Sequence, residues 1–315
     1  MRNQDGDERH GGLSERKRSV LKNAVLIAGP TASGKSRLAI RIAEAAGGIV
    51  VNADSMQVYD VLRVITARPM PDEEARVPHR LFGHVDPAIA YSVAKWLADV
   101  DALVKSPEAA RKLIFVGGTG LYFRALTEGI SQMPDIPPAI RKKWRQALLD
   151  AGAEALHREL GALDPRAAER LRPSDGQRIV RALEVVEASG RSILDWQGDR
   201  SQPPVDAQSA RKIVLAPGRD FLRDMIDRRF DGMIASGALD EVRAILALDL
   251  APSLPARKAI GVPELAAFLS GEASLDDAIA RAKLATKQYA KRQETWFRNQ
   301  FGPDWERVQP DRGKS

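Results

Sequence analysis

The sequence predicts an α/β fold: a parallel sheet flanked by helices, with a helical domain inserted in it. Short, continuous apolar runs bounded by turn residues are typical of buried parallel strands. A helical pattern over residues 36–46 lies between the first two runs, and the order strand–helix–strand is how α/β folds begin. A later stretch, residues 137–204, shows only helical spacing of its apolar residues.

Four apolar runs are the candidate strands. They are Ala24 to Ala28, Ile49 to Val51, Leu113 to Val116 and Ile213 to Ala216. Glycine, asparagine or proline follows each run, so each is expected to end in a turn. These turns lie at the carboxyl edge of a parallel sheet, which is where ligands bind in such folds.

The chain divides by composition. Residues 24–136 and 205–301 are predicted to form the α/β core with C-terminal helices. Residues 137–204 are rich in Ala, Leu, Arg and Glu, and proline and glycine mark both ends, so this stretch is predicted to be a helical insertion domain. Residues 1–23 are expected to be a disordered leader and residues 302–315 a frayed tail, because both are polar.

Composition excludes several classes of protein. The 315 residues are 44% hydrophobic, which is too apolar for a disordered chain. Cysteine is absent, which excludes disulfide scaffolds, thiolate zinc sites and thiol catalysis. No apolar run has the length of a membrane span and no signal peptide is recognisable, so we expect a cytoplasmic protein. The net charge of +6 is compatible with nucleic-acid binding but does not require it.

A phosphate-binding loop follows the first candidate strand. Its residues are Gly29, Pro30, Thr31, Ala32, Ser33, Gly34, Lys35 and Ser36. The pattern G-x-x-x-x-G-K-[ST] between a strand and a helix is typical of ATP-binding and other nucleotide-binding proteins and predicts a P-loop NTPase-like sheet. Backbone N–H groups and Lys35 would hold a di- or triphosphate, and the Ser36 hydroxyl would suit Mg²⁺. The motif does not say which phosphate compound is bound.

Asp54 stands out because it is the one acidic residue at the end of a predicted strand. An NTP hydrolase needs such an acid on a later strand to hold its metal, but the run at residues 113–116 ends in glycine. In a parallel sheet Asp54 lies beside the phosphate loop. On these grounds three interpretations stay open: a metal ligand, a general base, or the cap of a following helix.

Several sequence blocks extend the pattern beyond the phosphate loop. They are GPTASGKS (29–36), NADSMQVY (52–59), TARP (66–69), GGTGLYF (117–123), residues 177–185, Arg229-Phe230, Ile260-Gly261 and KRQETW (291–296). Together, in this order and spacing, they resemble the tRNA dimethylallyltransferase family, the tRNA isopentenyltransferases. The resemblance covers nearly the whole chain, from about residue 24 to residue 301.

The resemblance implies a prenyl transfer. The dimethylallyl group of dimethylallyl diphosphate would pass to N6 of the adenosine on the 3′ side of the anticodon, in tRNAs that read codons starting with U. N6-isopentenyladenosine would form and diphosphate would leave. The implied partners are dimethylallyl diphosphate and the tRNA anticodon stem-loop, with Mg²⁺ as cofactor. Since one chain can clamp one RNA, we expect a monomer.

The resemblance also implies roles for individual residues. Asp54 matches the family's general base, Lys35 and Arg229 match cations that stabilise the departing diphosphate, and Thr119 matches a threonine near the reacting centre. The residues that match tRNA contacts are Asp54, Ser55, Met56, Gln57, Thr119, Arg141, Gln177, Arg178, Ile179, Val180 and Arg181.

A basic stripe on the predicted C-terminal helix points to RNA independently of the family. Lys283, Lys287 and Lys291 repeat every four residues and therefore share one helix face. We interpret this stripe as a contact with the RNA backbone. The neighbouring Trp296 and Phe297 are expected to face the core.

Four positions depart from the family pattern. Ile65 stands where glycine is usual, Arg68 where lysine is usual, Met225 where some members have arginine, and Val262 where tyrosine is frequent. Three rival functions share the phosphate loop: a small-molecule or nucleotide kinase, an enzyme that prenylates free adenine nucleotides, and a non-catalytic RNA-binding module. The blocks outside the phosphate loop favour prenyl transfer to tRNA over all three.

Overall fold

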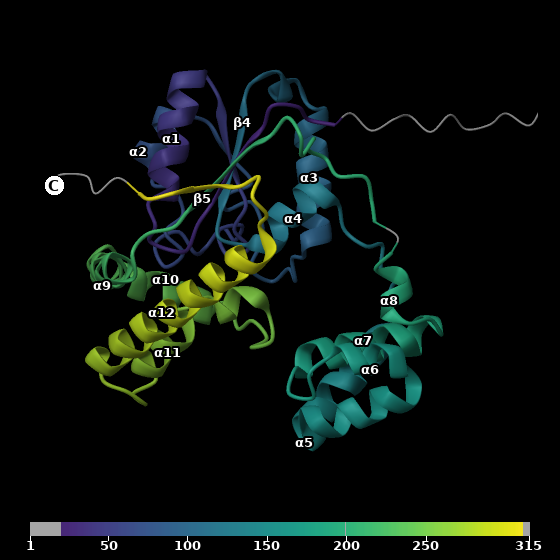
Figure 1. Ribbon diagram of the computed structural model, residues 1–315. Coiled ribbons are helices and arrows are strands. Elements are labelled where there is room, and N and C mark those ends of the chain that lie inside the picture. The colour runs from purple at the N-terminus through teal and green to yellow at the C-terminus, as the bar shows by residue number, and fades with distance from the viewer. Residues whose placement is uncertain (1–19, 199, 311–315) are drawn as a thin grey trace, which may run out of the picture.

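The computed structural model describes residues 20–198 and 200–310 (Figure 1). Within this range six strands form one sheet in the order β3-β2-β4-β1-β5-β6, and all neighbouring strands are parallel. The strands are β1 (Val25–Ala28), β2 (Ile49–Asn52), β3 (His79–Arg80), β4 (Leu113–Gly117), β5 (Arg211–Leu215) and β6 (Glu306–Val308). The four predicted strands are present as β1, β2, β4 and β5, and the predicted parallel α/β sheet is confirmed.

Helices cover both faces of this sheet. Before the insertion they are α1 (Lys35–Ala46), α2 (Pro71–Arg76), α3 (Val93–Lys105), η1 (Pro107–Ala110) and α4 (Gly120–Glu128). After β5 they are α9 (Arg219–Ala235), α10 (Ala238–Ala247), η2 (Pro255–Lys258), α11 (Val262–Leu269) and α12 (Leu275–Gln300). None of the helices in the described part of the chain combines the length and apolarity that crossing a bilayer requires.

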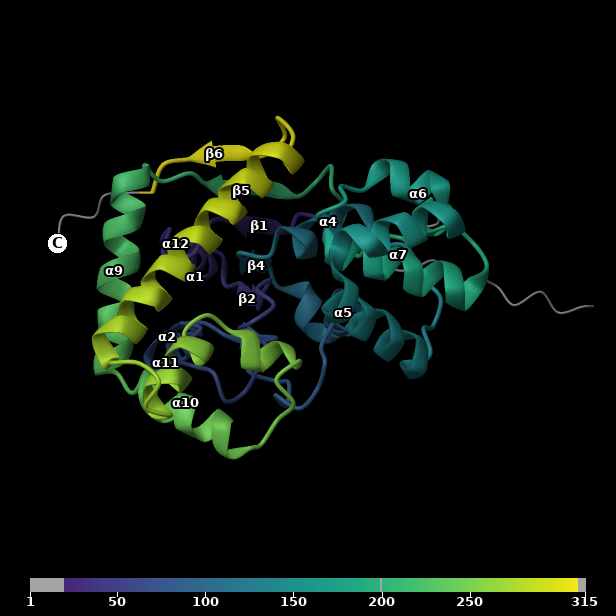
Figure 2. The same ribbon diagram turned by 90° about the horizontal axis from the view of Figure 1, so that it is seen from below.

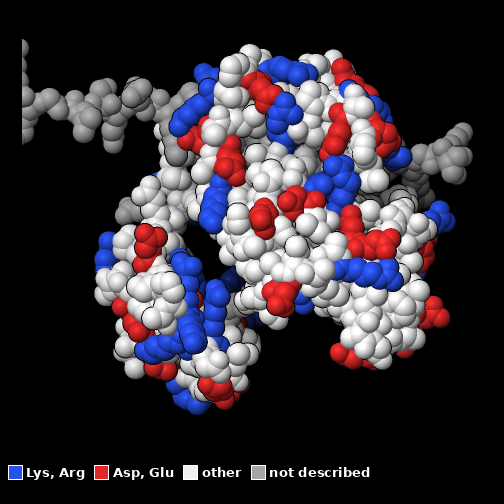
Figure 3. All heavy atoms as spheres, turned by 180° about the vertical axis from the view of Figure 1, so that it is seen from behind, with Lys and Arg blue, Asp and Glu red and all other residues white. Residues whose placement is uncertain are grey.

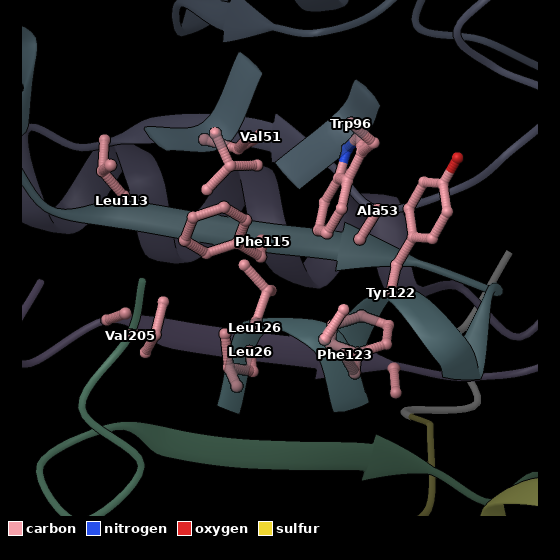
Figure 4. Close-up of a cluster of buried hydrophobic side chains, with 14 of the residues drawn as sticks. Leu26, Val51, Ala53, Trp96, Leu113, Phe115, Tyr122, Phe123, Leu126 and Val205 are labelled. Carbon is pink, nitrogen blue, oxygen red and sulfur yellow. The ribbon is translucent and has the colours of Figure 1, made fainter. Parts of the chain in front are cut away.

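The strands are buried on both sides, which explains why they are continuous apolar runs. On one face, α1 packs on side chains such as Val25 and Ile114. On the other, α3 and α4 place Trp96, Tyr122 and Phe123 against strand residues (Figure 4). Trp96 and Tyr122 stack with ring centroids 4.2 Å apart. Burying each such large side chain contributes about 1.5–3 kcal/mol, so this layer fixes the strands whose ends carry the site.

Sheet register brings the loops after β1, β2 and β4 together at the carboxyl edge. Ala28 pairs with Gly117, and Asn52 pairs with Val116. The chain after β4 passes so close to the chain after β2 that a Cβ atom on Gly117 would lie 2.0 Å from the carbonyl oxygen of Ala53. Glycine is therefore required at this position, because any side chain would separate the two loops.

Residues 138–196 form four helices that lie apart from the sheet (Figures 1 and 2). They are α5 (Pro138–Leu163), α6 (Pro165–Arg170), α7 (Gly176–Ser189) and α8 (Ile193–Trp196). Trp144, Leu160 and Leu183 are fully buried in a core of their own. In Figure 2 these helices lie on one side of the molecule and α9–α12 on the other.

The predicted frayed tail is wrong for residues 302–310. Trp305 is buried and stacks on Phe301 with ring centroids 3.6 Å apart, and β6 extends the sheet beside β5. The buried indole supplies the hydrophobic driving force that a polar tail would lack. Residues 311–315 lie outside the described range.

The predicted leader also begins to be ordered before residue 24. The Leu21 N–H donates to the carbonyl oxygen of Pro204 at 2.8 Å, and Leu21 forms a bridge with Val205. Residues 1–19 of the predicted leader lie outside the described residues.

Candidate active site

A cavity of about 320 Å³ opens at the carboxyl edge of the sheet, between the loops after β1 and β2 and helices α9 and α12. Its polar lining comes from Thr31, Lys35, Asp54, Ser55, Gln57, Thr66, Arg229, Lys258, Thr286, Tyr289 and Arg292. Its apolar lining comes from Met56, Ile65, Ile226, Phe230, Met233, Ala259 and Ile260. A second cavity of about 440 Å³ adjoins it and shares Lys35, Arg229 and Met233. Segments far apart in sequence therefore meet in one place.

The phosphate loop has the backbone that an anion cradle needs. Ala32 and Gly34 both have positive φ, 62° and 84°, so the chain curls tightly before α1 begins at Lys35. The Lys35 ammonium is buried and donates to the Pro30 carbonyl oxygen at 3.3 Å. The Ser33 hydroxyl is buried without a hydrogen-bond partner. The positive end of α1 and this curled backbone make a binding site for a phosphate group.

Burial perturbs both cations of the site, Lys35 and Arg229. The pKa of the Lys35 ammonium is lowered to about 8, chiefly by burial and also by the nearby Arg229 guanidinium, against the opposing effect of Asp54. Burial also lowers the pKa of Arg229, again against the attraction of Asp54. Two buried cations beside a single carboxylate leave an excess of positive charge, so binding of an anion that neutralises this charge is strongly favourable.

Asp54 is fixed by the loop that follows β2. Its N–H donates to Asn52 Oδ1 at 2.8 Å, and its Oδ1 accepts from the Met56 N–H at 3.0 Å. No helix begins here, since the next one starts at Pro71; Asp54 therefore closes a turn and does not cap a helix. This turn leaves the carboxylate in the wall of the cavity.

Thr119 ties the loop after β4 to the Asp54 loop. Its Oγ1 accepts from the Ser55 N–H at 2.9 Å and donates to Ser55 Oγ at 3.3 Å. Gln57 is held by the next segment, because its Nε2 donates to the carbonyl oxygens of Thr66 and Ala67, both at 2.9 Å. Arg229 reaches the same segment, donating from Nη2 to the Thr66 oxygen at 3.3 Å.

Helix α12 contributes site residues that were not predicted, among them Tyr289 and Gln293. Tyr289 lines the cavity, and burial together with the charge of Asp54 raises the pKa of its phenol. Gln293 is 5% exposed and contacts both the phosphate loop and the loop after β4. Their i, i+4 spacing puts them on one helix face, and the signal that could have found them is Gln293 in the KRQETW block with an aromatic residue one turn before it.

The glycine-to-isoleucine departure at Ile65 does not strain the backbone. Ile65 is not among the described residues with positive φ. Its side chain packs against Gly261, where a Cβ atom would lie 2.5 Å from Ile65 Cδ1. The isoleucine therefore forms part of the apolar wall of the cavity. Arg68 is buried and donates from Nη1 to the Tyr59 oxygen at 2.9 Å.

A larger cleft of about 1030 Å³ separates the insertion from α4 and α12. Its cations are Arg124, Arg170, Arg178, Arg181, Lys291 and Arg292. Figure 3 shows Lys and Arg side chains on the insertion beside this hollow. Arg292 lines both the cleft and the smaller cavity, so the two are adjacent.

The structure separates the predicted tRNA contacts into those that line the cleft and those that do not. Arg178, Arg181 and Lys291 line it. Arg141 is exposed on the first turn of α5 and, like Gln177, is not among the residues that line it.

Ile179 and Val180 are wrong as contacts, because both are buried in the core of the insertion. Helical periodicity places them on the inner face of α7, opposite the arginines.

The predicted basic stripe is also corrected. Lys283 pairs with Asp231 at 2.6 Å, and Lys287 pairs with Asp227 at 2.7 Å. These lysines join α12 to α9, so their charges are neutralised within the fold. The expected inward orientation of Phe297 is confirmed, since it is 2% exposed, and Trp296 packs against the same core.

The oxygen donors near the phosphate loop suit Mg²⁺. Ser36 lines the second cavity beside Lys35, and Asp54 lines the first. Among the described residues no group of three or more His, Asp or Glu could hold a metal by itself. Mg²⁺ is commonly bound through one or two protein oxygens together with substrate phosphates, and the residues present fit that mode.

A parallel sheet with this phosphate loop places the chain in the P-loop class of proteins. Within that class, the family model described as IPP transferase matches residues 57–300. The chain belongs to the IPP transferase family.

Similar sequences and solved structures carry consistent names. A tRNA dimethylallyltransferase of Chelativorans sp. is 62% identical over 92% of this chain and 99% of its own length, and that of Mesorhizobium japonicum is 60% identical over 92% and 90%. The crystal structure of a tRNA isopentenylpyrophosphate transferase from Bacillus halodurans has a TM-score of 0.64 at 32% identity, covering 91% of this chain and 90% of that one. A eukaryotic dimethylallyltransferase acting on tRNA has a TM-score of 0.74 at 27% identity, covering 90% and 71%.

Proposed function

We propose that this chain is a tRNA dimethylallyltransferase. It transfers the dimethylallyl group of dimethylallyl diphosphate to N6 of the adenosine 3′-adjacent to the anticodon, in tRNAs that read codons starting with U. The observation that carries the proposal is one cavity that holds both the phosphate-loop Lys35 and the Asp54 carboxylate. Names of relatives that match over nearly their whole length support it.

The cavity residues divide the reaction between them. Lys35, Arg229 and the backbone N–H groups of the phosphate loop bind the diphosphate and stabilise the charge that it gains as the allylic C–O bond breaks. Asp54 accepts a hydrogen bond from the exocyclic amine, orients it, and takes its proton as the N6–C bond forms. N6-isopentenyladenosine and diphosphate are then the products. The apolar residues of the cavity lining, including Ile65 and Phe230, suit the hydrocarbon group.

Mg²⁺ would be held by the Ser36 hydroxyl and the diphosphate oxygens. When bound, it would neutralise part of the charge on the leaving group. Every other role in the proposed reaction belongs to the residues of the chain.

The cleft provides a place for the anticodon stem-loop. Phosphate groups release counterions when they meet lysine and arginine side chains, so the cations of the cleft favour RNA backbone. The target adenosine must leave the base stack to reach Asp54. The cleft and the cavity meet at Arg292, and this junction supports entry of the base from the RNA side. We further propose a cytoplasmic enzyme that works as a monomer.

A transfer assay tests the proposal. Purified protein is incubated with labelled dimethylallyl diphosphate, Mg²⁺ and unmodified tRNA carrying adenosine at the target position. Parallel reactions contain AMP, or ATP with no isoprenoid. Label on the tRNA, lost when the target adenosine becomes guanosine, is the expected result. Label on AMP alone would indicate an enzyme for free nucleotides, and consumption of ATP without transfer of label would indicate a kinase; either result would overturn the proposal.

A further inference from the structure

One buried side chain connects the two loops between which the proposed reaction occurs. Gln293 lies on α12 and is 5% exposed. Its Oε1 accepts from the Thr31 N–H of the phosphate loop at 2.9 Å. Its Nε2 donates to the Gly118 carbonyl oxygen at 2.9 Å. Both hydrogen bonds span more than a hundred residues of sequence, so nothing local requires them.

The chemistry of these partners explains why the residue is glutamine. The Thr31 N–H only donates and the Gly118 carbonyl only accepts, so the linking group must accept at one end and donate at the other. A carboxamide does this, whereas a carboxylate cannot donate and a hydrocarbon does neither. Buried N–H and C=O groups that lose their partner are costly, so the amide fixes the distance between the two loops.

The loop after β4 also lies directly against Asp54. A Cβ atom on Gly118 would lie 2.2 Å from Gln293 Nε2 and 3.2 Å from Asp54 Oδ2. The next residue, Thr119, accepts a hydrogen bond from the Ser55 N–H. Gln293 therefore connects the diphosphate side of the cavity to the segment that carries the general base.

The same helix faces the RNA cleft. Lys291 and Trp296 line the cleft, and Tyr289, one turn before Gln293, lines the cavity. We propose that Gln293 is a positioning residue that couples diphosphate binding at the phosphate loop to placement of the target base at Asp54. This inference rests on the proposed function. Binding of either substrate fixes one end of the amide link and so favours the arrangement that the other substrate needs.

The test measures coupling without turnover. The affinity of tRNA is measured with and without saturating inorganic diphosphate, for the wild type, Gln293→Leu and Gln293→Glu. We expect diphosphate to tighten tRNA binding by about tenfold in the wild type, within the usual range of coupling between sites. In both variants this effect should fall below about twofold. At a pH at which its carboxyl group is ionised, Gln293→Glu keeps an acceptor for Thr31 but loses the donor to Gly118, so it decides the question if Gln293→Leu does not fold.

A matched control and a kinetic readout separate positioning from general damage. Gln288 is on the same helix and exposed, and Gln288→Leu should keep the full coupling. At saturating substrates, transfer by the Gln293 variants should be slower by about 100-fold, as expected for a small misplacement of reacting groups, while the affinity for tRNA alone stays the same.

Coupling that is absent in the wild type, or intact in both Gln293 variants, would overturn the inference. Failure of the proposed function would appear separately, as a wild-type protein that transfers no label to tRNA.

Discussion

The depressed pKa of Lys35 makes a quantitative prediction about substrate binding. In the free protein burial lowers the pKa of this ammonium to about 8. A bound diphosphate places negative charge beside it and raises its pKa again. Binding therefore takes up a proton at any pH at which free Lys35 is partly neutral, and affinity must fall as the pH rises through about 8.

The magnitude follows from the fraction of free protein that carries the charge. With a pKa of about 8, Lys35 is about nine-tenths protonated at about pH 7 and about one-tenth protonated at about pH 9. The affinity for dimethylallyl diphosphate should therefore drop by about tenfold between these pH values. At about pH 8, binding should take up about half a proton per molecule. The terminal phosphate of the ligand titrates near pH 6 and does not contribute to this change.

Titration calorimetry in buffers of different ionisation enthalpy measures both quantities. Lys35→Arg keeps its charge throughout this range, so its affinity, although changed overall, should not depend on pH between about 7 and about 9. Lys95→Met, at an exposed lysine of α3, should behave like the wild type. Equal wild-type affinity at the two pH values, or an unchanged slope in Lys35→Arg, would refute the reasoning.

Three further predictions concern transfer, RNA binding and folding. Asp54→Asn should slow single-turnover transfer by about 10³-fold while diphosphate still binds by calorimetry; unimpaired transfer would remove Asp54 as the base. The double variant Arg178→Gln, Lys291→Gln should bind tRNA more weakly and should reduce the slope of log affinity against log salt by about 1.5. Lys283→Gln should leave that slope unchanged. Equal slopes in all variants would contradict the assignment of the cleft to RNA. Gly117→Ala should lower the free energy of unfolding in urea by about 2 kcal/mol or more, because its Cβ would lie 2.0 Å from the Ala53 oxygen; a variant as stable as the wild type would show that the two loops can separate freely.

The main strands and the phosphate loop could be predicted because their signals are local. A run such as Leu113 to Val116, continuously apolar and followed by glycine, has few alternatives to a buried strand. The strands β3 and β6 could not be found in this way, since they have two and three residues and only half-buried or exposed side chains. Their place in the sheet depends on pairing with distant strands, which sequence periodicity does not report.

The errors in the predicted RNA surface have a different cause. Periodicity correctly put Lys283 and Lys287 on one face of α12, but it cannot say what that face meets. The face meets α9, where Asp227 and Asp231 repeat with the same spacing of four residues. A search for matching i, i+4 acids on the preceding long helix would have favoured an interhelical contact. Arg178, whose side chain is 76% exposed, and Lys291 line the cleft.

Different faces of α12 make different contacts, which explains the composition of this helix. One face pairs with the acids of α9, a second buries Phe297 under the sheet, a third places Tyr289 and Gln293 in the site, and a fourth carries Lys291 to the cleft. The remaining face of α12 is exposed to solvent and carries residues such as Leu284 and Gln288, so only the residues on the other faces are held by contacts within the fold. Residues of α12 line both the cavity and the cleft, so this one helix connects the two on the core side. The insertion forms the other wall of the cleft, and it is joined to the core only through the segments that precede α5 and follow α8.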